Sequence, residues 1–551
     1  MNNTLLQHFN GIHDVAYISL KKIAIDNIAK CNTTLDGMKQ FTTIERTEEI
    51  LDYLITYVRN IIRMGFSTEE IDCELNTLYN YDDKNQELFN AIISKLSTPI
   101  KSGIPTELKQ YEFYLKRIIT DHTTDDSIDL SVYKDVHSSL EQYQALINKS
   151  AYDGENISDI FLSYQDSNTT NRQEMKALLH KGITEVEFEL SSLYMRIKTY
   201  QYDLAASYGF NNPLEYIANK YCISYDTIEY MLSQTTNYKE NIARFICRFD
   251  EFGIDQCDVL SCIMKPNKLK PFSLSFNETL DILEECFGRL DCEFGKMIYA
   301  AKVENWIDWE KRKGKLNGSY TNVIPFCKKS IISMSFDGSI SDICKLAHEL
   351  GHAFHGICVS EHSFYNTDFS VITAEMFGLF CENYALLYLM KHYMKPCDVK
   401  EWKREFYCNG LRTFLHNLIA FHFENKSFHS VKRSHQTPTD IYDSVLMDLG
   451  VKQEEDIQPY EWLFRSQNFF PDFFYYNFVY VIGEIVSLSL INDLVRKEID
   501  FNAIKEMLTQ SGIDNVDRLF DSINQNLHSA SIYNIIRTLD QLWDASLDND
   551  Y

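Results

Sequence analysis

The residues best able to do chemistry in this sequence are His348, Glu349 and His352, which form an H-E-x-x-H pattern. In an α-helix, with its 3.6 residues per turn, residues four apart differ by only about 40° around the axis. Both imidazoles could therefore reach one metal ion from one face. Glu349 lies beside them, where it could take a proton from a water on that metal. The pattern is typical of the active-site helix of a zinc peptidase.

The residues around this pattern predict a helix that is largely buried. Apolar side chains recur at helical spacing on both sides of the motif, at Ile343, Leu346, Ala347, Leu350 and Phe354. Asp342 could cap the N-terminus of the helix. The alternative is an amphipathic helix that carries two solvated histidines. Because unpaired imidazoles are costly in a buried environment, the apolar context favours the metal site.

A catalytic zinc site needs a third protein ligand, and the best candidate is Glu375. Glu375 and Glu382 are seven residues apart, so they share one face of a helix whose other positions are mostly apolar. A carboxylate in that setting needs a partner, which a metal would supply. Glu375 is therefore predicted to bind the metal. Glu382 would orient a ligand imidazole, or it is simply a helix-surface residue, and His355 is expected to be structural.

A strand-like run precedes the predicted metal helix. Residues 330–336 favour a β-strand, and Asp337-Gly338 is typical of the turn that closes it. Such a strand could present an open edge that pairs with the backbone of an extended substrate. It could equally belong to a small hairpin that packs under the helix. The residues alone leave both interpretations open.

The remainder of the chain is predicted to be mostly α-helical. Only 10 Pro and 20 Gly occur in 551 residues, and apolar residues recur at helical spacing over 44–62, 174–208 and 378–393. The length allows two to four domains or one large helical body. A soft boundary near residue 166 separates an N-terminal helical region, residues 1–165, from residues 166–551, which carry the motif. The lobes of the molecule are expected to be interleaved in sequence.

Charge and cysteine usage limit the possible partners and compartment. A formal net charge of −26 argues against binding to nucleic acid or to an anionic membrane. The 14 cysteines include no C-x-x-C pair, which is typical of free thiols in a reducing compartment. The N-terminus lacks the basic and apolar regions of a signal peptide, and the apolar stretch at 473–482 is too short and polar to span a membrane. We therefore expect a cytoplasmic protein.

The layout of these motifs resembles the M3 metallopeptidases, specifically the bacterial oligoendopeptidase F branch. That family carries an H-E-x-G-H helix and a glutamate ligand 27 residues after the first histidine, which is the separation of His348 and Glu375. Similarity extends over about residues 166–490. The most similar further segments are the basic loop at 311–320, the strand-to-helix passage at 336–342 and the Tyr-rich segment at 473–483.

The resemblance implies a mainly α-helical, two-lobed body around a deep channel, with a small β-sheet beside the H-E-x-x-H helix. One Zn²⁺ per chain would lie at the channel floor, bound by His348, His352 and Glu375. The implied activity is zinc-dependent endopeptidase cleavage of short, unstructured oligopeptides, with Glu349 as general base. Residues 166–551 would then be the catalytic region, and the strand near 331–336 would bind the substrate backbone. The oligomeric state stays open.

The same resemblance assigns a role to two tyrosines. Tyr480 would donate a hydrogen bond to the tetrahedral intermediate, together with Tyr476, which lies one helical turn earlier on the same face. Phenol hydroxyls suit this role because they are donors that stay neutral at pH 7. The neighbouring Tyr475 and the phenylalanines of this segment are expected to be ordinary core residues.

One departure from the family pattern keeps other functions open. Many members have a substrate-contacting histidine shortly before the Tyr-rich segment, whereas residues 465–471 contain none. Asn468 or Gln467 could replace that donor, or the contact is lost. A helical metallocarboxypeptidase, which also uses H-E-x-x-H in a channel, is a second enzyme interpretation. A family member that has lost activity and serves as a peptide-binding or scaffold protein is a third.

Overall fold

The fold is defined by a computed structural model, which describes most of the chain. The described residues are 15–31, 37–63, 68–102, 106–115, 136, 138–148, 150–152, 155–166, 169–234, 237–244, 272–312, 315, 318–431, 436–451, 458–471, 474–529 and 535–547. Four positions of the basic loop (313, 314, 316 and 317), residues 167–168 at the predicted boundary and Phe473 of the Tyr-rich segment lie outside the described residues.

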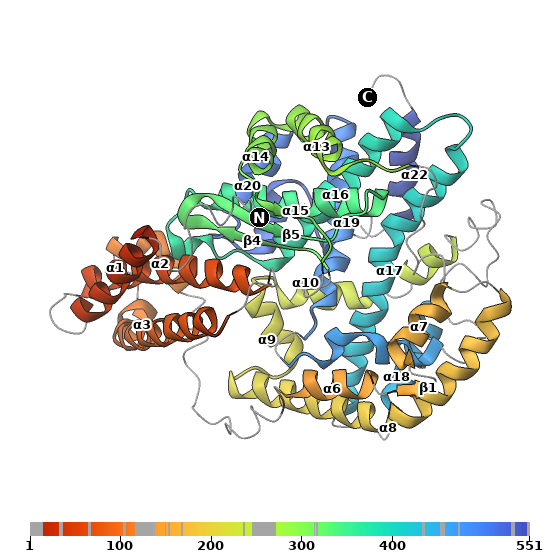
Figure 1. Ribbon diagram of the computed structural model, residues 1–551, viewed down its shortest axis with the longest axis horizontal. Helices are drawn as coiled ribbons and strands as arrows, with labels where there is room; N and C mark the ends of the chain where they lie inside the picture. Colours follow the sequence, from red (N-terminus) through yellow and green to blue (C-terminus); the bar gives the residue numbers. More distant parts are fainter. Residues whose placement is uncertain are drawn as a thin grey trace. The chain divides into compact units, whose positions relative to one another are not determined.

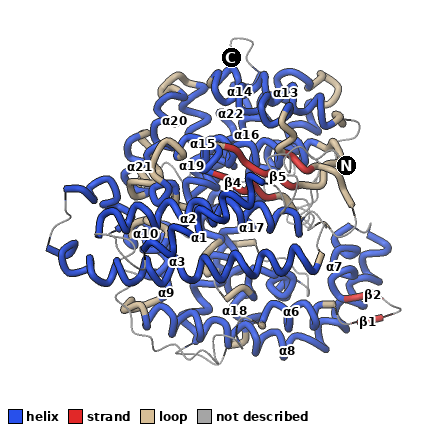
Figure 2. Tube along the Cα trace, turned by 60° about the vertical axis from the view of Figure 1, so that its left-hand side comes forward, coloured by secondary structure: helices blue, strands red, loops and turns tan. Residues whose placement is uncertain are grey.

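The described chain is built mainly from α-helices with a small β-sheet, which confirms the predicted fold class (Figures 1 and 2). It divides into two compact units, each made of three separate segments of the sequence. Unit 1 comprises Met1–His122, Lys268–His392 and Arg496–Asn524. Unit 2 comprises Thr123–Asn267, Tyr393–Val495 and Gln525–Tyr551.

Unit 1 contains the small sheet and the helices around it. Its N-terminal segment forms α1 (Val15–Cys31), α2 (Gly37–Arg63), α3 (Glu69–Ser102) and the 3₁₀ helix η2 (Thr106–Tyr111). Its middle segment forms α13 (Phe276–Leu290), α14 (Cys292–Val303), β3 (Ile307–Asp308), β4 (Tyr320–Ile324), η4 (Pro325–Cys327), β5 (Lys329–Ser333), α15 (Ile340–Val359), η5 (Phe364–Thr367) and α16 (Val371–Tyr393). Its last segment forms α20 (Phe501–Gln510) and α21 (Val516–Ser522).

Unit 2 is almost entirely helical within the described residues. Its first segment forms α6 (Ser139–Ile147), the short strands β1 (Ser150–Tyr152) and β2 (Glu155–Asn156), α7 (Ile157–Asp166), α8 (Thr169–Ser207), α9 (Pro213–Lys220) and α10 (Tyr225–Ser233). Its later segments form α17 (Val399–Val431), α18 (Pro438–Leu449), η6 (Gln458–Phe464), η7 (Ser466–Phe469), α19 (Asn477–Val495) and α22 (Ile535–Leu547).

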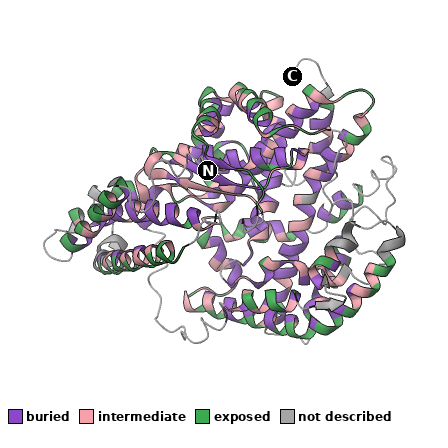
Figure 3. Cartoon of the chain, viewed as in Figure 1, coloured by how far each residue is buried: buried purple, intermediate pink, exposed green. Residues whose placement is uncertain are grey.

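The helices form where the apolar spacing predicted them. Residues 44–62 lie in α2, 174–208 are almost wholly in α8, and 378–393 lie in α16. In unit 1, α1, α2 and α3 share one buried cluster, to which Ile324 of β4 and Ile331 of β5 also belong. Figure 3 shows α15 and α16 largely buried, whereas α8 alternates buried and exposed faces. The elements that carry the predicted ligands are therefore core helices.

The sheet order corrects one prediction about the strand before the metal helix. The order is β3-β5-β4, with β5 parallel to β3 and antiparallel to β4. Ile332 of β5 is paired on both sides, with Ile307 and with Thr321. The prediction of an open edge on this strand is therefore wrong. The hairpin interpretation is confirmed, since β4 and β5 form an antiparallel pair that packs against α15 (Figure 2).

α19 is a described helix that is long and apolar enough to cross a membrane, with a mean hydropathy of 1.7. Two thirds of that stretch, 67%, is buried inside the protein. Core helices of soluble proteins have the same properties, so the composition of α19 is accounted for by packing.

Candidate metal centre

The helix that carries the H-E-x-x-H pattern begins one turn earlier than the sequence suggested. Ser339 is its N-cap, and the Ser339 hydroxyl accepts a hydrogen bond from the Asp342 backbone N–H at 3.3 Å. Asp342 is thus not the cap. It lies in the first turn, where its carboxylate accepts a hydrogen bond from the Asp337 N–H at 2.8 Å. A negative charge at this position also interacts favourably with the positive end of the helix dipole. The predicted Asp337-Gly338 turn leads directly into this cap, with Gly338 at φ 84°.

The three predicted ligands lie together in the described structure. One ligand atom from each of His348, His352 and Glu375 falls within 4.8 Å of the others. Glu375 Oε2 is 3.3 Å from His348 Nε2 and 3.9 Å from His352 Nε2. The two rings are nearly perpendicular, at 84°, with centroids 4.6 Å apart. The helical spacing on α15 and the position of Glu375 on α16 thus direct three donors toward one point.

Two glycines allow α16 to approach α15 this closely. A Cβ at Gly378 would lie 2.6 Å from His348 Nε2, so any side chain there would displace the imidazole. A Cβ at Gly351 would lie 2.8 Å from the Cys381 sulfur. The absence of side chains at these two positions therefore makes room for the His348 ring and brings Glu375 within reach of it. Gly351 belongs to the H-E-x-G-H pattern, whereas nothing in the sequence marks Gly378 as a functional position.

Glu382 lies on the opposite side of the His348 ring from Glu375. Its Oε2 is 3.5 Å from His348 Nδ1, whereas Glu375 faces Nε2. Burial disfavours the charged imidazole, but the two carboxylates outweigh that effect and hold the pKa of His348 well above its usual range. Burial and the neighbouring His348 lower the pKa of His352. Metal ligation requires neutral imidazoles, so metal uptake would displace a proton from this cluster.

Glu349 is held by a residue that could not be identified from the sequence. Its side chain is buried, at 4% exposure, and Glu349 Oε2 accepts a hydrogen bond from the Thr321 hydroxyl at 2.5 Å. Thr321 also lies 3.0 Å from the Glu349 backbone oxygen. Thr321 belongs to β4, so the sheet beside α15 fixes the carboxylate that follows the first histidine. No sequence spacing indicates this contact, because it depends on how β4 packs across the helix.

The donor set fits zinc. Two imidazole nitrogens and one carboxylate oxygen are the ligands of a common catalytic zinc site, which keeps a further position for water or substrate. The three side chains come from two buried helices, so their backbone positions are fixed by packing. The Glu382 contact to the other nitrogen of His348 matches the carboxylate–histidine pair that usually orients a metal ligand.

His355 makes its contacts with other residues than the three predicted ligands. It is fully buried, its Nε2 is 2.7 Å from the Ser511 hydroxyl, and its ring lies 4.0 Å from that of Phe369. Burial, aided by the charge of His352, lowers the pKa of His355 to about 3. The side chain therefore stays neutral over the physiological pH range, in keeping with a structural role.

This lowered pKa predicts how stability depends on acid. The unfolded chain takes up a proton at this residue near pH 6.5 and the folded chain only near pH 3, so stability falls as the pH drops through that window. Between pH 7 and 5.5 the loss from this residue is about 1 kcal/mol. Calorimetric melting should show a smaller acid-induced drop for His355→Gln than for wild type, while the exposed His429→Gln should behave as wild type. Equal drops in all three proteins would contradict it.

The two predicted tyrosines lie together in unit 2. Tyr476 precedes α19 directly and Tyr480 lies in its first turn, with their hydroxyl oxygens 3.4 Å apart. Both are half-buried, and their rings meet edge to face at 5.5 Å. Their role in catalysis stays a prediction. Tyr475 is buried, as expected of a core residue.

Of the two candidates for the missing histidine donor, Asn468 is already engaged. Its side-chain nitrogen donates to the Trp462 carbonyl at 2.9 Å, and the residue is buried. Gln467 is exposed on η7. If either replaces the histidine, Gln467 has the accessible amide.

Known proteins that are similar to this chain in sequence are peptidases. Residues 290–530, which include all the predicted ligands, match the model of peptidase family M3. The oligoendopeptidase F homolog of Mycoplasma genitalium is 26% identical over 360 residues, which cover 55% of this chain and 57% of that protein. The chain therefore aligns with little more than half of the length of that relative.

Solved structures share the fold over almost the whole chain. A putative peptidase from Chlamydophila abortus has a TM-score of 0.74 at 15% identity and covers 92% of this chain and 90% of its own. Oligoendopeptidase-F from Enterococcus faecium has a TM-score of 0.61 at 13% identity, with 97% and 98% covered. The fold is thus that of helical oligopeptidases. Over residues 290–530 the chain matches peptidase family M3, and the relatives that it resembles in sequence include oligoendopeptidase F homologs.

Proposed function

We propose that this protein is a zinc-dependent endopeptidase that hydrolyses short, unstructured peptides, with residues 166–551 as its catalytic region. The observation that carries the proposal is the convergence of His348, His352 and Glu375 within 4.8 Å, with Glu349 on the same helix as the histidines. The match of residues 290–530 to peptidase family M3 supports the reaction class.

The proposed mechanism assigns proton transfer to Glu349. A zinc ion held by the three ligands would polarise a peptide carbonyl and lower the pKa of water. The Glu349 carboxylate accepts a proton from the attacking water and passes it to the leaving amine. Thr321 limits the motion of this carboxylate through its hydroxyl, which keeps one carboxylate oxygen in a fixed direction.

Tyr480, together with Tyr476, donates hydrogen bonds to the oxygen on which negative charge develops. Donors fixed in advance around that oxygen typically accelerate such reactions by about 10²–10³-fold each. The 3.4 Å separation of the two hydroxyls supports a joint role, because both could reach one oxygen atom.

The proposed partners are oligopeptides, and neither nucleic acid nor membrane is a proposed partner. The net charge of −26 supports this, since both of those surfaces attract basic proteins. The cysteines among the described residues are all free thiols, which supports a reducing, cytoplasmic location.

The proposal is tested by hydrolysis of a short, internally quenched peptide whose two ends are blocked, on protein of counted zinc content. We expect internal cleavage, about one zinc per chain, and loss of cleavage on adding a chelator. Cleavage that needs a free C-terminus would support the carboxypeptidase instead. Stoichiometric zinc without cleavage of any peptide tested would favour the binding protein.

A further inference from the structure

The backbone just before the tyrosine pair adopts a conformation that tyrosine rarely takes. Tyr475 has φ 55°, in the left-handed region that favours glycine. Its carbonyl accepts a hydrogen bond from the Phe478 N–H at 3.3 Å, so a turn that begins at Tyr475 leads into α19. Because Tyr476 follows it directly and Tyr480 lies one turn on, the backbone at Tyr475 sets where both hydroxyls point. Such a conformation persists only where surrounding contacts enforce it.

A buried carboxylate supplies the main contact to this backbone. Glu424 Oε2 accepts a hydrogen bond from the Tyr475 N–H at 2.7 Å. Its other oxygen, Oε1, accepts from Lys198 Nζ at 2.5 Å. Lys198 is only 1% exposed and Glu424 5%, so the pair is shielded from water. Glu424 lies on α17 and Lys198 on α8, so two long helices meet beside Tyr475, two residues before α19 begins.

A third buried residue holds the chain ahead of Tyr475. Gln201, one turn after Lys198 on α8, accepts from Lys198 Nζ at 2.9 Å. Its amide nitrogen lies 2.9 Å from the Pro471 carbonyl and 3.2 Å from that of Phe470. The same cluster therefore contacts the backbone on both sides of residues 472–473.

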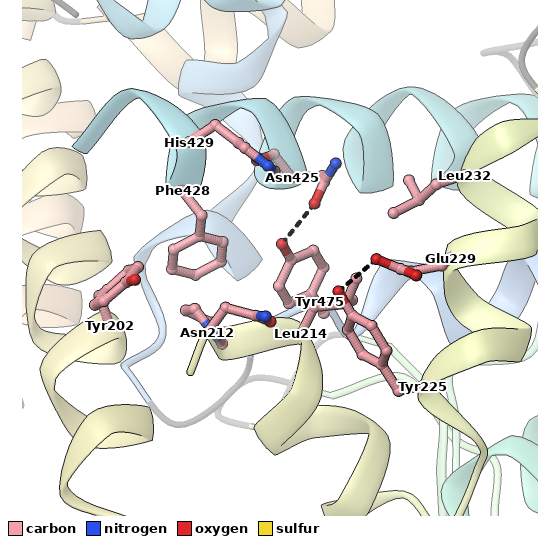
Figure 4. Close-up of a pocket in the computed structure, with 11 residues that line it drawn as sticks. Tyr202, Asn212, Leu214, Tyr225, Glu229, Leu232, Asn425, Phe428, His429 and Tyr475 are labelled. Carbon is pink, nitrogen blue, oxygen red and sulfur yellow. Dashed lines mark hydrogen bonds between the residues drawn. The ribbon is translucent and has the colours of Figure 1, made fainter. Parts of the chain in front are cut away.

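The side chain of Tyr475 is fixed as well. Figure 4, a close-up of a cavity of about 530 Å³ in unit 2, shows its hydroxyl directed at Asn425. That hydroxyl donates to Asn425 Oδ1 at 2.8 Å, and the ring stacks on Phe428 at 5.1 Å. Asn425 and Phe428 belong to α17, as does Glu424. Tyr475 is thus an anchor, held at its backbone and its side chain by one helix.

Burying a lysine and a glutamate is expensive, and a well-packed apolar pair is often as stable, so stability alone does not explain the cluster. We propose that Glu424, itself held by Lys198 and Gln201, is a positioning residue that fixes the backbone ahead of α19 and so sets the directions of the Tyr476 and Tyr480 hydroxyls, on which their proposed hydrogen bonds to the tetrahedral intermediate depend. This inference rests on the proposed role of the two tyrosines. The inference means that catalysis also requires Glu424, which is not one of the proposed metal ligands.

A matched pair of double variants tests this inference in the full-length zinc-loaded enzyme. Both carry Lys198→Met, which removes the buried cation, so neither leaves an unpaired charge. Glu424→Gln keeps an oxygen that can accept from the Tyr475 N–H, whereas Glu424→Leu removes it. A misplacement of about 1 Å can cost roughly 100-fold in rate. We therefore expect kcat of K198M/E424L to be at least about tenfold below that of K198M/E424Q, with KM and zinc content alike.

A second comparison separates positioning from general stability. In a Tyr476→Phe/Tyr480→Phe background, the difference between the two double variants should disappear, because the groups being positioned are gone. Equal kcat values in the original background, or a difference that persists without the tyrosine hydroxyls, would overturn the inference. If K198M/E424L does not fold, Gln201→Met takes its place in the same comparison, against wild type, with a smaller fall in kcat expected.

The controls distinguish a failure of this inference from a failure of the proposed function. If the wild-type enzyme cleaves no peptide, the proposed function is wrong. If the wild type is active but Tyr476→Phe/Tyr480→Phe is equally active, the role of the tyrosines is wrong and the inference falls with it. If the tyrosine hydroxyls matter but the matched pair behaves identically, only the role of Glu424 is wrong.

Discussion

Glu349→Gln is expected to lower kcat by about 10²–10⁴-fold, the usual contribution of a general base, while bound zinc stays at the wild-type level. The amide has nearly the same shape as the carboxylate and can still accept the hydrogen bond from Thr321, but it cannot take up a proton. The ligands are unchanged, so metal binding is preserved. The measurement is kcat on a quenched peptide, with zinc counted in the same preparation.

Glu361→Gln is a suitable control for this variant. Glu361 lies in the same unit, just after α15, and is exposed, where it pairs with Lys328. Its loss should leave both kcat and zinc content unchanged. A Glu349→Gln enzyme that turned over at a rate close to wild type would remove Glu349 from the mechanism.

Glu375→Gln is expected to have the largest effect on metal binding, because it replaces a charged ligand with a poor one. The loss of zinc affinity should exceed the roughly 10–100-fold typical of a residue that only orients a ligand. Glu382→Gln supplies that comparison on the same helix face, since Glu382 contacts the other nitrogen of His348. Competition with a chelator of known affinity measures both variants.

Two results would contradict this assignment. Full zinc occupancy in Glu375→Gln would exclude Glu375 as a ligand, and the same holds for a variant of His348. A larger loss of zinc affinity in Glu382→Gln than in Glu375→Gln would indicate that Glu382 is the ligand and that Glu375 orients His348. Far-ultraviolet circular dichroism should show that both variants keep the helical content of the wild type.

The parts of the fold that could be predicted from sequence depend on local periodicity. The apolar spacing around His348 and around Glu375 predicted two core helices, and the structure has both as α15 and α16. The spacing of four between the histidines directly implies a shared face. The four-residue spacing of Tyr476 and Tyr480 likewise placed their hydroxyls together, 3.4 Å apart.

The parts that could not be predicted depend on contacts between distant segments. The strand order β3-β5-β4 gives β5 two neighbours, and no local pattern distinguishes a central strand of this length from an edge. The cap of α15 was misassigned because Ser339 and Asp342 are both good capping residues, and only the backbone shows which one precedes the helix. The contact of Thr321 with Glu349 arises from packing of β4 on α15.

The anchoring of the tyrosine segment shows the same limit more strongly. Lys198 and Glu424 are 226 residues apart in the sequence, and the sequence around each predicts only a charged residue on a long helix. Their partnership follows only from how α8 and α17 pack in unit 2. The left-handed backbone at Tyr475 is also unexpected, since the residue is not glycine or asparagine.

The division into two discontinuous units has a consequence for how the protein is made. Unit 1 needs the segment Arg496–Asn524, and unit 2 needs Gln525–Tyr551, so each unit stays incomplete long after its first segment has been made. The apolar faces of α1, α2 and α3 pack partly on Ile324 and Ile331, which leave the ribosome much later. Domains usually fold in order as they emerge. This nascent chain is expected instead to carry exposed apolar helices until those later segments emerge, and so to depend on chaperones that hold unfinished chains.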